Sequence, residues 1–324
     1  MTQSIFFWLL ATVLLTTVSI AEAQQKNKIP RIGILEPTGE GTCDKGFRLG
    51  LRELGYVEKQ NILLEQRAAD ANPDRLRELA GELAQLKPDV IWTHSPPAVL
   101  AAKAATTTIP IVVGVARDLV ELGIVSSLAR PGGNITGMEL RDSEIIGKRL
   151  ELLTQALPKA SRVAVLVNPK DPGHAVIPRN IEREARALRI QLQRVEVGSS
   201  EAIDKAFADI AQVRADALLL PESATLSAHR HRIFELAISK RLATAAGGPH
   251  FAEAGSLISY GANVVDVCQR STLFIDKILK GAKPTDLPVE RPSKFEFVIN
   301  LKTAKQIRLN IPPNVVGRAD RVIR

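Results

Sequence analysis

Residues 89–105 read DVIWTHSPPAVLAAKAA, and this stretch indicates the fold class of the chain. The apolar run at 90–93 is typical of a buried strand, the Ser-Pro-Pro turn ends it, and the alanine-rich run that follows predicts a helix. Similar pairs recur upstream, in RIGIL (31–35) with its helix and in NILLEQRAA (61–69), which leads to a helix capped by Asn72. This alternation predicts a parallel sheet with helices on both faces.

The glycines of RPGGNITG (130–137) interrupt the alternation, which then restarts in a second group of segments. That group includes RVAVLVN (162–168), ADALLLP (215–221) and LATAAGG (242–248). The sequence therefore predicts an α/β protein with two similar lobes, each built on a parallel sheet. The final section holds two more strand-and-helix units, which we expect to cross back between the lobes.

Residues 1–23 have the pattern of a cleaved export signal. An uncharged apolar run from Ile5 to Ile20 precedes Ala21-Glu22-Ala23, which fits a small-residue cleavage site. The segment before the run has no Lys or Arg, and a run of this length also suits a short membrane anchor, which is the alternative. We expect a soluble protein of the periplasm.

The chain is basic, with 43 Lys and Arg against 35 Asp and Glu. The net charge is +8, and loss of residues 1–23 removes Glu22 and no base, which leaves +9. Such an excess of bases can indicate binding to a nucleic acid or to an anionic membrane surface, or it can serve only solubility. The distribution of the bases along the sequence distinguishes these cases. The bases are interleaved with acids, as in EREARALRIQLQR (182–194), so we expect solvated helix faces and no nucleic acid.

Motifs that would indicate catalysis are missing from the sequence. It contains no Gly-x-Gly-x-x-Gly, Walker A, Gly-x-Ser-x-Gly or His-Glu-x-x-His motif, and its two cysteines, Cys43 and Cys268, have no zinc-site spacing. An oxidising compartment would permit one bridge between them. We predict no cofactor, no metal and no catalytic residue. The alternative is an enzyme that uses Glu36, Asp118 or Glu222, which all follow predicted strands.

Several phrases together form the signature of one family. They are GLRELGYVEKQNI (50–62), KPDVIW (87–92), LARPGGNITGM (128–138), RVAVLVNPKDP (162–172), FAEAGSLISYG (251–261) and IPPNVVGRAD (311–320). Nearly all of residues 29–324 resembles the periplasmic solute-binding components of ABC transporters with the type I periplasmic-binding-protein fold, a group that includes tryptophan- and tyrosine-type binding proteins.

The resemblance implies two Rossmann-like lobes, joined by three crossings, that close on a small ligand. It implies an N-terminal lobe of residues 29–135 plus about 257–287 and a C-terminal lobe of residues 136–256 plus about 293–324. It also implies an ABC permease in the inner membrane as the partner. Nothing in the sequence demands more than a monomer, which is the state we expect. A third interpretation, a sugar-responsive repressor core, would need a DNA-binding segment before residue 29, where the export signal lies.

Two turns depart from the family pattern, so the ligand is not copied from relatives. Ala116-Arg117-Asp118-Leu119 stands where Gly-Asp-Pro-Val is frequent, and Ser95-Pro96-Pro97 stands where Thr-Pro-Ala is frequent. Since sugar sites usually stack their ligand on aromatic rings and this chain has few, we expect a small polar solute that is amino-acid-like or another carboxylate.

Ser95 is predicted to lie at a helix N-terminus, where free amides and the helix dipole attract carboxylates. Pro97 removes one of these donors, so a plain capping turn is the alternative. His94 should point to the other side of its strand, which leaves Ser95 without a base. The turn is therefore expected to hold a ligand, not to react with it.

Arg117 and Asp118 follow the predicted strand IPIVVGV (109–115) at the mouth of the cleft. They either bind the carboxylate and the ammonium group of an amino acid, or pair with each other, in which case Ser95 and Glu222 bind the ligand. Other positions after strands complete the predicted site. The full set of predicted ligand-binding residues is Glu36, Thr38, Ser95, Arg117, Asp118, Asn168, Glu222, Gly248 and Tyr260.

Overall fold

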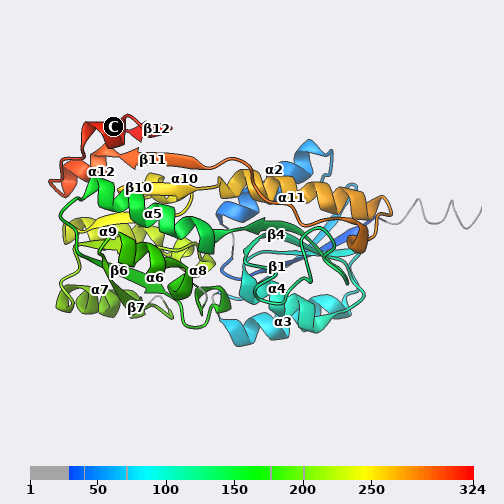
Figure 1. The fold of residues 1–324 in the computed structure, drawn as a ribbon. Helices are drawn as coiled ribbons and strands as arrows, with labels where there is room; N and C mark the ends of the chain where they lie inside the picture. The colour runs from blue at the N-terminus through cyan, green and yellow to red at the C-terminus, as the bar shows by residue number, and fades with distance from the viewer. Residues whose placement is uncertain (1–28, 40, 71, 176, 200) are drawn as a thin grey trace, which may run out of the picture.

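The computed structural model describes residues 29–39, 41–70, 72–175, 177–199 and 201–324, which form two α/β lobes side by side (Figure 1). The predicted export signal at residues 1–23 lies outside the described residues. Within the described part of the chain, no helix has the length and apolar character needed to cross a membrane.

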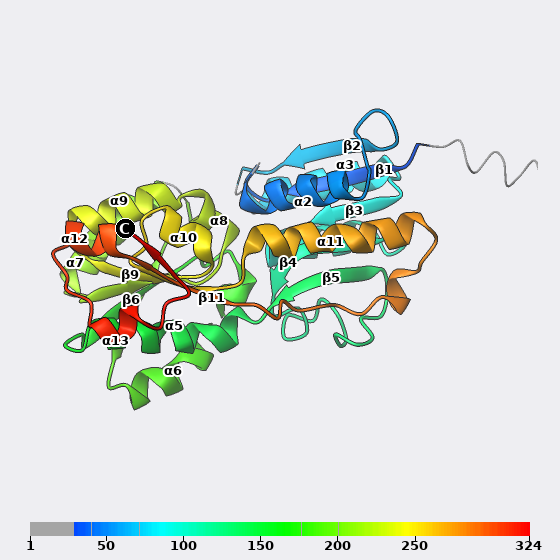
Figure 2. The same cartoon turned by 90° about the horizontal axis from the view of Figure 1, so that it is seen from above.

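The first lobe contains a parallel five-stranded sheet in the order β2-β1-β3-β4-β5. Its strands are β1 (Arg31–Glu36), β2 (Leu63–Ala68), β3 (Val90–Thr93), β4 (Ile111–Arg117) and β5 (Ile135–Leu140). The helices α2 (Thr42–Glu53) and α11 (Val264–Leu279) cover one face, and α3 (Pro73–Gln85) and α4 (Pro96–Ala105) cover the other (Figure 1). Figure 2 shows α2 and α11 side by side in front of the sheet. As predicted, the Asn72 side chain caps α3 by accepting from Asp74 N and Arg75 N.

The period-two pattern of the strands accounts for this three-layer arrangement. Ile32 and Ile34 of β1 pack with residues of α2 and α11, whereas Leu35 packs with α3 and α4. Trp92 of β3 follows the same rule and stacks on Phe47 of α2, with ring centroids 4.2 Å apart. Both faces of β1, β3, β4 and β5 are therefore buried, as expected for a parallel sheet, whereas the edge strand β2 is half-buried.

The second lobe contains a seven-stranded sheet in the order β12-β11-β10-β9-β8-β6-β7, in which only the β10–β11 pair is antiparallel. Its strands are β6 (Arg162–Val167), β7 (Gln191–Glu196), β8 (Ala217–Leu219), β9 (Ala243–Ala246), β10 (Ile258–Gly261), β11 (Glu296–Asn300) and β12 (Arg321–Ile323). Its helices are α5 (Asp142–Ala156), α6 (Ile177–Ala187), α7 (Ala202–Gln212), α8 (Ala224–Ala228), α9 (Arg230–Ser239), α10 (Pro249–Glu253), α12 (Leu301–Gln306) and α13 (Pro313–Val316), with short 3₁₀ turns η1 (Pro172–Ala175) here and η2 (Pro284–Asp286) in the first lobe.

Three crossings connect the lobes: from β5 to α5, from β10 to α11, and from η2 to β11 (Figure 1). Two boundaries differ from those that the sequence suggested. The first lobe runs to Leu140 instead of residue 135, because β5 pairs with β4. The segment that returns to it starts with α11 instead of residue 257, because β10 pairs with β9 and β11 of the second sheet.

Close contact between α2 and α11 ties this returning segment to the first lobe. A Cβ atom at Gly46 would lie 2.2 Å from Val265 O, so only glycine allows this approach of the two helices. A disulfide joins Cys43 of α2 to Cys268 of α11, whose Cα atoms are 5.3 Å apart. It links positions 225 residues apart in sequence.

Replacement of both cysteines by serine is expected to lower the free energy of unfolding by about 2–4 kcal/mol, because the cross-link restricts the unfolded chain. Guanidinium unfolding with and without a thiol reductant measures the effect. The reductant should destabilise the wild-type protein and leave C43S/C268S unchanged. Equal stability of the oxidised wild type and the variant would contradict this role.

Candidate functional site

The carboxyl ends of the strands in both sheets face each other and enclose a cavity of about 640 Å³. This volume suits a small-molecule ligand. The loops after β1, β3 and β4 line it from the first lobe, and the loops after β6, β8 and β9 line it from the second. Of the predicted residues, Thr38, Ser95, Arg117 and Glu222 lie in its wall.

A buried ion pair joins the lobes at this cavity. The guanidinium of Arg117, at the end of β4, lies 2.5 Å from the carboxylate of Asp171, which follows β6. Their side chains are only 4% and 3% exposed. Burial opposes the charge of Arg117, but Asp171 raises its pKa, so the guanidinium stays charged. Arg117 thus pairs with a residue of the other lobe, a partner that the sequence did not suggest.

Two serine hydroxyls, one from each lobe, face the cavity without a hydrogen-bond partner among the described residues. Ser95 precedes α4 and is 8% exposed, and Ser223 precedes α8 and is 7% exposed. Neither side chain caps its helix. A buried hydroxyl without a partner costs about 1–3 kcal/mol, so both are placed to bond to a ligand.

His94 also lines the cavity, although it was expected on the other side of its strand. The alternation ends there because Ser95 adopts a left-handed backbone with φ of +68°. The His94 Nε2 atom lies 2.9 Å from Glu36 Oε2. Glu36 itself is fully buried and does not line the cavity, whereas its partner His94 does.

Glu222 is held in a network of the second lobe. Its Oε1 atom accepts a 2.7 Å hydrogen bond from Gly248 N, and its backbone N donates to Asp142 Oδ2 over 2.9 Å. Asp142 in turn pairs with the fully buried Arg149 over 2.5 Å. Burial raises the pKa of Glu222 to about 7; Arg149 opposes the rise and Asp142 adds to it.

Glycine is required beside this carboxylate. A Cβ atom at position 247 would lie 1.8 Å from Glu222 Oε1, so any other residue would displace the side chain. Gly248 does not line the cavity; its amide holds Glu222 instead. The two glycines that end β9 therefore position a cavity residue.

The remaining predicted residues lie around the cavity instead of in its wall. Asn168 lines a small adjoining cavity together with Thr38 and Ser95. Asp118 is buried behind the wall, with a φ of +54° that turns it away from the strand direction. Tyr260 packs against Phe295 and the core of the second lobe, and only its carbonyl joins the network, by accepting from Arg149 Nε over 2.7 Å.

The sequence analysis did not identify several residues of the wall. Asp171, His250 and Arg230 all contribute to it. Asp171 follows β6 in the turn NPKD (168–171), so the rule that selected Asn168 would also have found it. His250 lies at the start of α10, and its burial lowers its pKa to about 3, which keeps the imidazole neutral.

The wall combines charged and hydroxyl side chains with aliphatic ones, and it contains no Phe, Tyr or Trp among the residues that the structure describes. Trp92, the nearest candidate for stacking, is fully buried and donates from its indole to Ser271 Oγ over 3.0 Å. Over the same described residues, no three His, Cys, Asp or Glu side chains are grouped so that they could hold a metal ion. The cavity is suited to hydrogen bonding and ion pairing.

Residues 28–323 match the family model of ABC transporter substrate binding proteins, and the chain belongs to this family. The tyrosine-binding protein of Clostridioides difficile is 25% identical over 287 residues, which cover 88% of this chain and 81% of that protein. Its similarity extends through both lobes. The chain is thus a relative of proteins that bind solutes, as the sequence resemblance implied.

Solved structures share the fold. A conserved domain protein from Vibrio cholerae superposes with a TM-score of 0.84 at 24% identity, covering 91% of this chain and all of that one. An ABC domain from Streptococcus pneumoniae in complex with L-Trp gives 0.82 at 23% identity, covering 90% of this chain and all of that one. The type I periplasmic-binding-protein fold predicted from the sequence is confirmed.

The raised pKa of Glu222 makes a specific pH dependence. The folded protein binds the Glu222 proton more tightly than the unfolded chain, in which the pKa has its ordinary value of 4.5. Protonated Glu222 therefore stabilises the folded state fully below pH 4.5, and this stabilisation is lost as the pH rises through about 7. Relative to wild type, Glu222→Gln should therefore gain about 1–3 kcal/mol of unfolding free energy across this window.

Urea unfolding of both proteins from pH 4.5 to 8 measures this difference. The exposed Glu235→Gln serves as the control and should follow the wild type at every pH. A difference between Glu222→Gln and wild type that stays constant through the window would show that Glu222 ionises normally.

Proposed function

We propose that this chain is an extracytoplasmic solute-binding protein that captures a small polar, amino-acid-like carboxylate between its lobes. It then delivers this solute to the permease of an ABC transporter in the inner membrane. The family membership, a tyrosine-binding relative and a structural neighbour that holds L-Trp support an amino-acid-like ligand.

The observation that carries this proposal is the pair of unpartnered hydroxyls of Ser95 and Ser223 in one cavity. They come from opposite lobes, so a solute that accepts hydrogen bonds from both stabilises the closed arrangement. A carboxylate fits best, because hydrogen bonds to a charged acceptor are about twice as strong as neutral ones. Lys45 and Arg230 in the same wall add positive charge.

The proposed location outside the cytoplasm has two supports. The pattern of residues 1–23 predicts export, and the Cys43–Cys268 disulfide suits an oxidising compartment. The permease partner follows from the family resemblance, and the monomeric state is the expectation from the sequence. Cleavage of the leader can be checked by N-terminal sequencing of the protein recovered from the periplasm.

Titration calorimetry against amino acids, organic acids and sugars tests the ligand class. We expect tight binding of one amino-acid-like carboxylate, recovered unchanged, and a loss of about 1–3 kcal/mol in binding free energy in each of Ser95→Ala and Ser223→Ala. The control is Ser239→Ala, an exposed serine that bonds to Leu236 O outside the cavity. Turnover of the solute, or tighter binding of a sugar, would refute the proposal.

The Arg117–Asp171 pair also predicts how lobe closure responds to mutation. Asp171→Asn removes the charge that Arg117 faces across the cleft, so the ligand-free protein should open and its radius of gyration should rise. Saturating ligand should reverse the change in small-angle scattering. Glu144→Gln, which breaks an exposed pair with Arg141, should leave the profile unchanged. Identical profiles for Asp171→Asn and wild type would exclude a bridging role.

A further inference from the structure

The positive charge of the protein lies in one lobe. The first lobe, residues 29–140 and 263–290, has 16 basic and 18 acidic residues, a net charge of −2. The second lobe, residues 141–262 and 291–324, has 25 basic and 16 acidic residues, a net charge of +9. Although bases and acids are interleaved along the sequence, the net positive charge is therefore concentrated in the second lobe.

Four arginines of the second lobe occupy a backbone position that usually belongs to glycine. Arg189, Arg214, Arg241 and Arg308 follow α6, α7, α9 and α12 with φ values from +50° to +58°. In each case the arginine N–H donates to the carbonyl three residues earlier, and the next N–H donates to the carbonyl five residues earlier. This is the Schellman helix ending, in which glycine is the common left-handed residue.

Three other helices take glycine at this ending, and α3 of the first lobe ends at the left-handed Lys87, whose N–H donates to Ala84 O. Gly55, Gly255 and Gly281 end α2, α10 and α11 with the same two hydrogen bonds. A left-handed residue other than glycine costs about 1 kcal/mol. Attraction to the helix dipole does not explain the four arginines, because a base anywhere in the last turn provides it without left-handed backbone. The arginines persist at a cost to stability.

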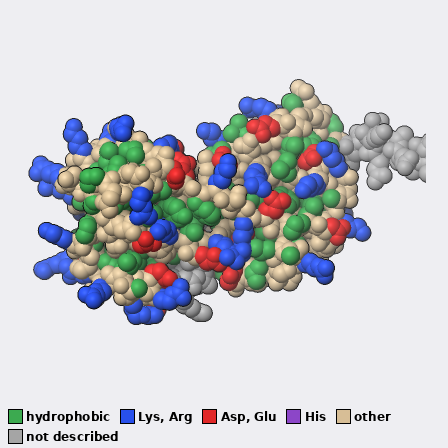
Figure 3. All heavy atoms as spheres, turned by 45° about the horizontal axis from the view of Figure 1, so that its top comes forward, with side chains coloured by type: hydrophobic (Ala, Val, Ile, Leu, Met, Phe, Trp, Pro, Cys, Tyr) green, Lys and Arg blue, Asp and Glu red, His purple; other side chains and the backbone are tan. Residues whose placement is uncertain are grey.

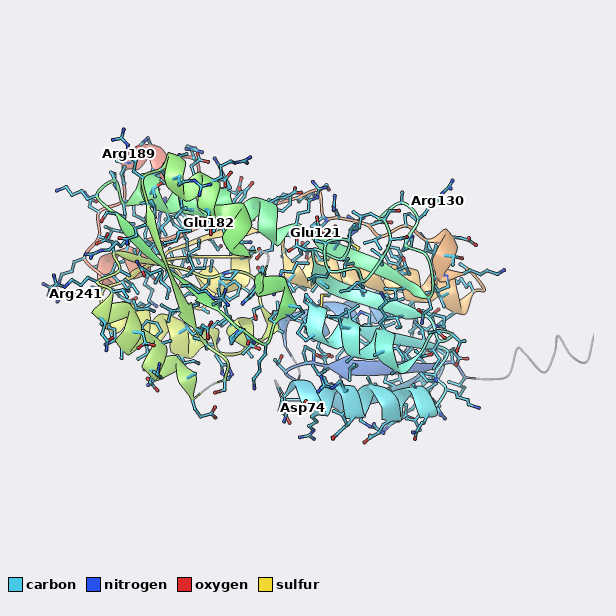
Figure 4. All side chains as sticks on the ribbon, turned by 60° about the horizontal axis from the view of Figure 1, so that its bottom comes forward. Asp74, Glu121, Arg130, Glu182, Arg189 and Arg241 are labelled. Carbon is cyan, nitrogen blue, oxygen red and sulfur yellow. A yellow bond between two sulfur atoms is a disulfide. The ribbon has the colours of Figure 1, made fainter. Side chains whose placement is uncertain are left out.

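The four arginines gather at the end of the second lobe that faces away from the cavity. The turns before β7, β8 and β9 lie at the amino edge of the same parallel sheet, where β8 and β9 are neighbours about 4.8 Å apart and β6 separates β8 from β7. Arg189 and Arg241 project from this end in Figure 4, and Figure 3 shows Lys and Arg side chains around it. All four arginines are exposed, and their side chains make no hydrogen bond or ion pair to another described residue.

Little negative charge opposes them. The turns at this end are residues 157–161, 188–190, 213–216, 240–242 and 307–312, and Asp216 is their one acid. Its carboxylate accepts from Ser161 N and Arg162 N over 2.8 and 2.9 Å, so it is engaged by the backbone. The same turns contain no aromatic residue, which removes the stacking contacts that single-stranded nucleic acids use.

An open apolar hollow adjoins Arg308. It has a volume of about 560 Å³, and its wall includes Leu301, Leu309, Ile311 and Val316 between α12 and α13, with Lys305 at its rim. A basic surface beside an apolar hollow matches the boundary between the phosphates and the acyl chains of a lipid layer. The planar guanidinium also matches a phosphate group.

We propose that this end of the second lobe, with Arg189, Arg214, Arg241 and Arg308, docks on the phosphate surface of an anionic phospholipid bilayer. The arrangement favours a bilayer over an acidic protein, because the bases are spread along a sheet edge and a bilayer presents phosphates at every point. Docking through the end remote from the cavity leaves the cleft open and the first lobe free.

Co-sedimentation of the purified protein with vesicles tests this proposal. Vesicles of phosphatidylglycerol and phosphatidylcholine should bind the protein, whereas vesicles of phosphatidylcholine alone should not. The variant R189N/R214N/R241N/R308N removes four charges and keeps a residue that tolerates left-handed backbone. Its partition coefficient should fall roughly 600-fold, because each of the four bases near an anionic surface contributes about fivefold.

The control removes the same charge from the first lobe. R67N/R75N/R77N/R270N replaces four exposed arginines that are already paired with acids, and it should bind the anionic vesicles like wild type. The variant with lysine at the four positions should also keep binding, since it keeps the charge. The asparagine variant should melt no lower than wild type, which separates loss of docking from loss of folding.

Three results would overturn the proposal. One is equal binding to anionic and neutral vesicles, and another is an equal loss in the two asparagine variants. The third is displacement of the vesicles by inorganic polyphosphate at matched phosphate concentration, which would identify a general polyanion surface instead of a bilayer site. None of these outcomes depends on the solute that the cavity binds.

Discussion

Strand direction is the constraint on which the rest of this structure depends. The five strands of the first lobe and strands β6 to β10 of the second lobe run toward the other lobe, so the loops that follow them meet at one cavity, whereas β11 and β12 run away from it. The amino edges of the strands and the ends of the preceding helices lie at the remote ends of the lobes. Residues that follow the strands running toward the cavity thus face a ligand, and residues that precede those strands face the surroundings.

Burial at the cavity divides its charged residues into two groups. Arg117–Asp171 and Arg149–Asp142 are ion pairs, and each partner offsets part of the other's cost of leaving water. Glu222 has no such partner; it accepts from a backbone amide beside Asp142, and its pKa rises. The pairs fix the positions of the loops, whereas Glu222 stays responsive to protonation near neutral pH.

The sequence was sufficient for the α/β alternation and for the cavity residues that directly follow strands, such as Thr38, Ser95 and Glu222. The sequence did not predict the direction or the partner of a side chain where a local change of backbone or a residue distant in sequence determines it. Ser95 shares the cavity with His94 because the backbone of Ser95 is left-handed, and Arg117 pairs with a residue 54 positions away. Tyr260 was predicted to follow a strand, but it lies within β10, and its ring packs against Phe295. Such features depend on sheet pairing, which periodicity does not encode.

Interleaved charge along a sequence does not mean balanced charge on a surface. On the sides of the second lobe, acids and bases pair within or between helices, as in Lys205–Asp209 and Arg232–Asp204. Such pairs neutralise acidic residues of the helices, because a helix places residues four positions apart on one face. The arginines just beyond the helix ends have no neighbour at that spacing. The excess charge therefore collects at the turns, where the parallel sheet brings the ends of successive helices into one row.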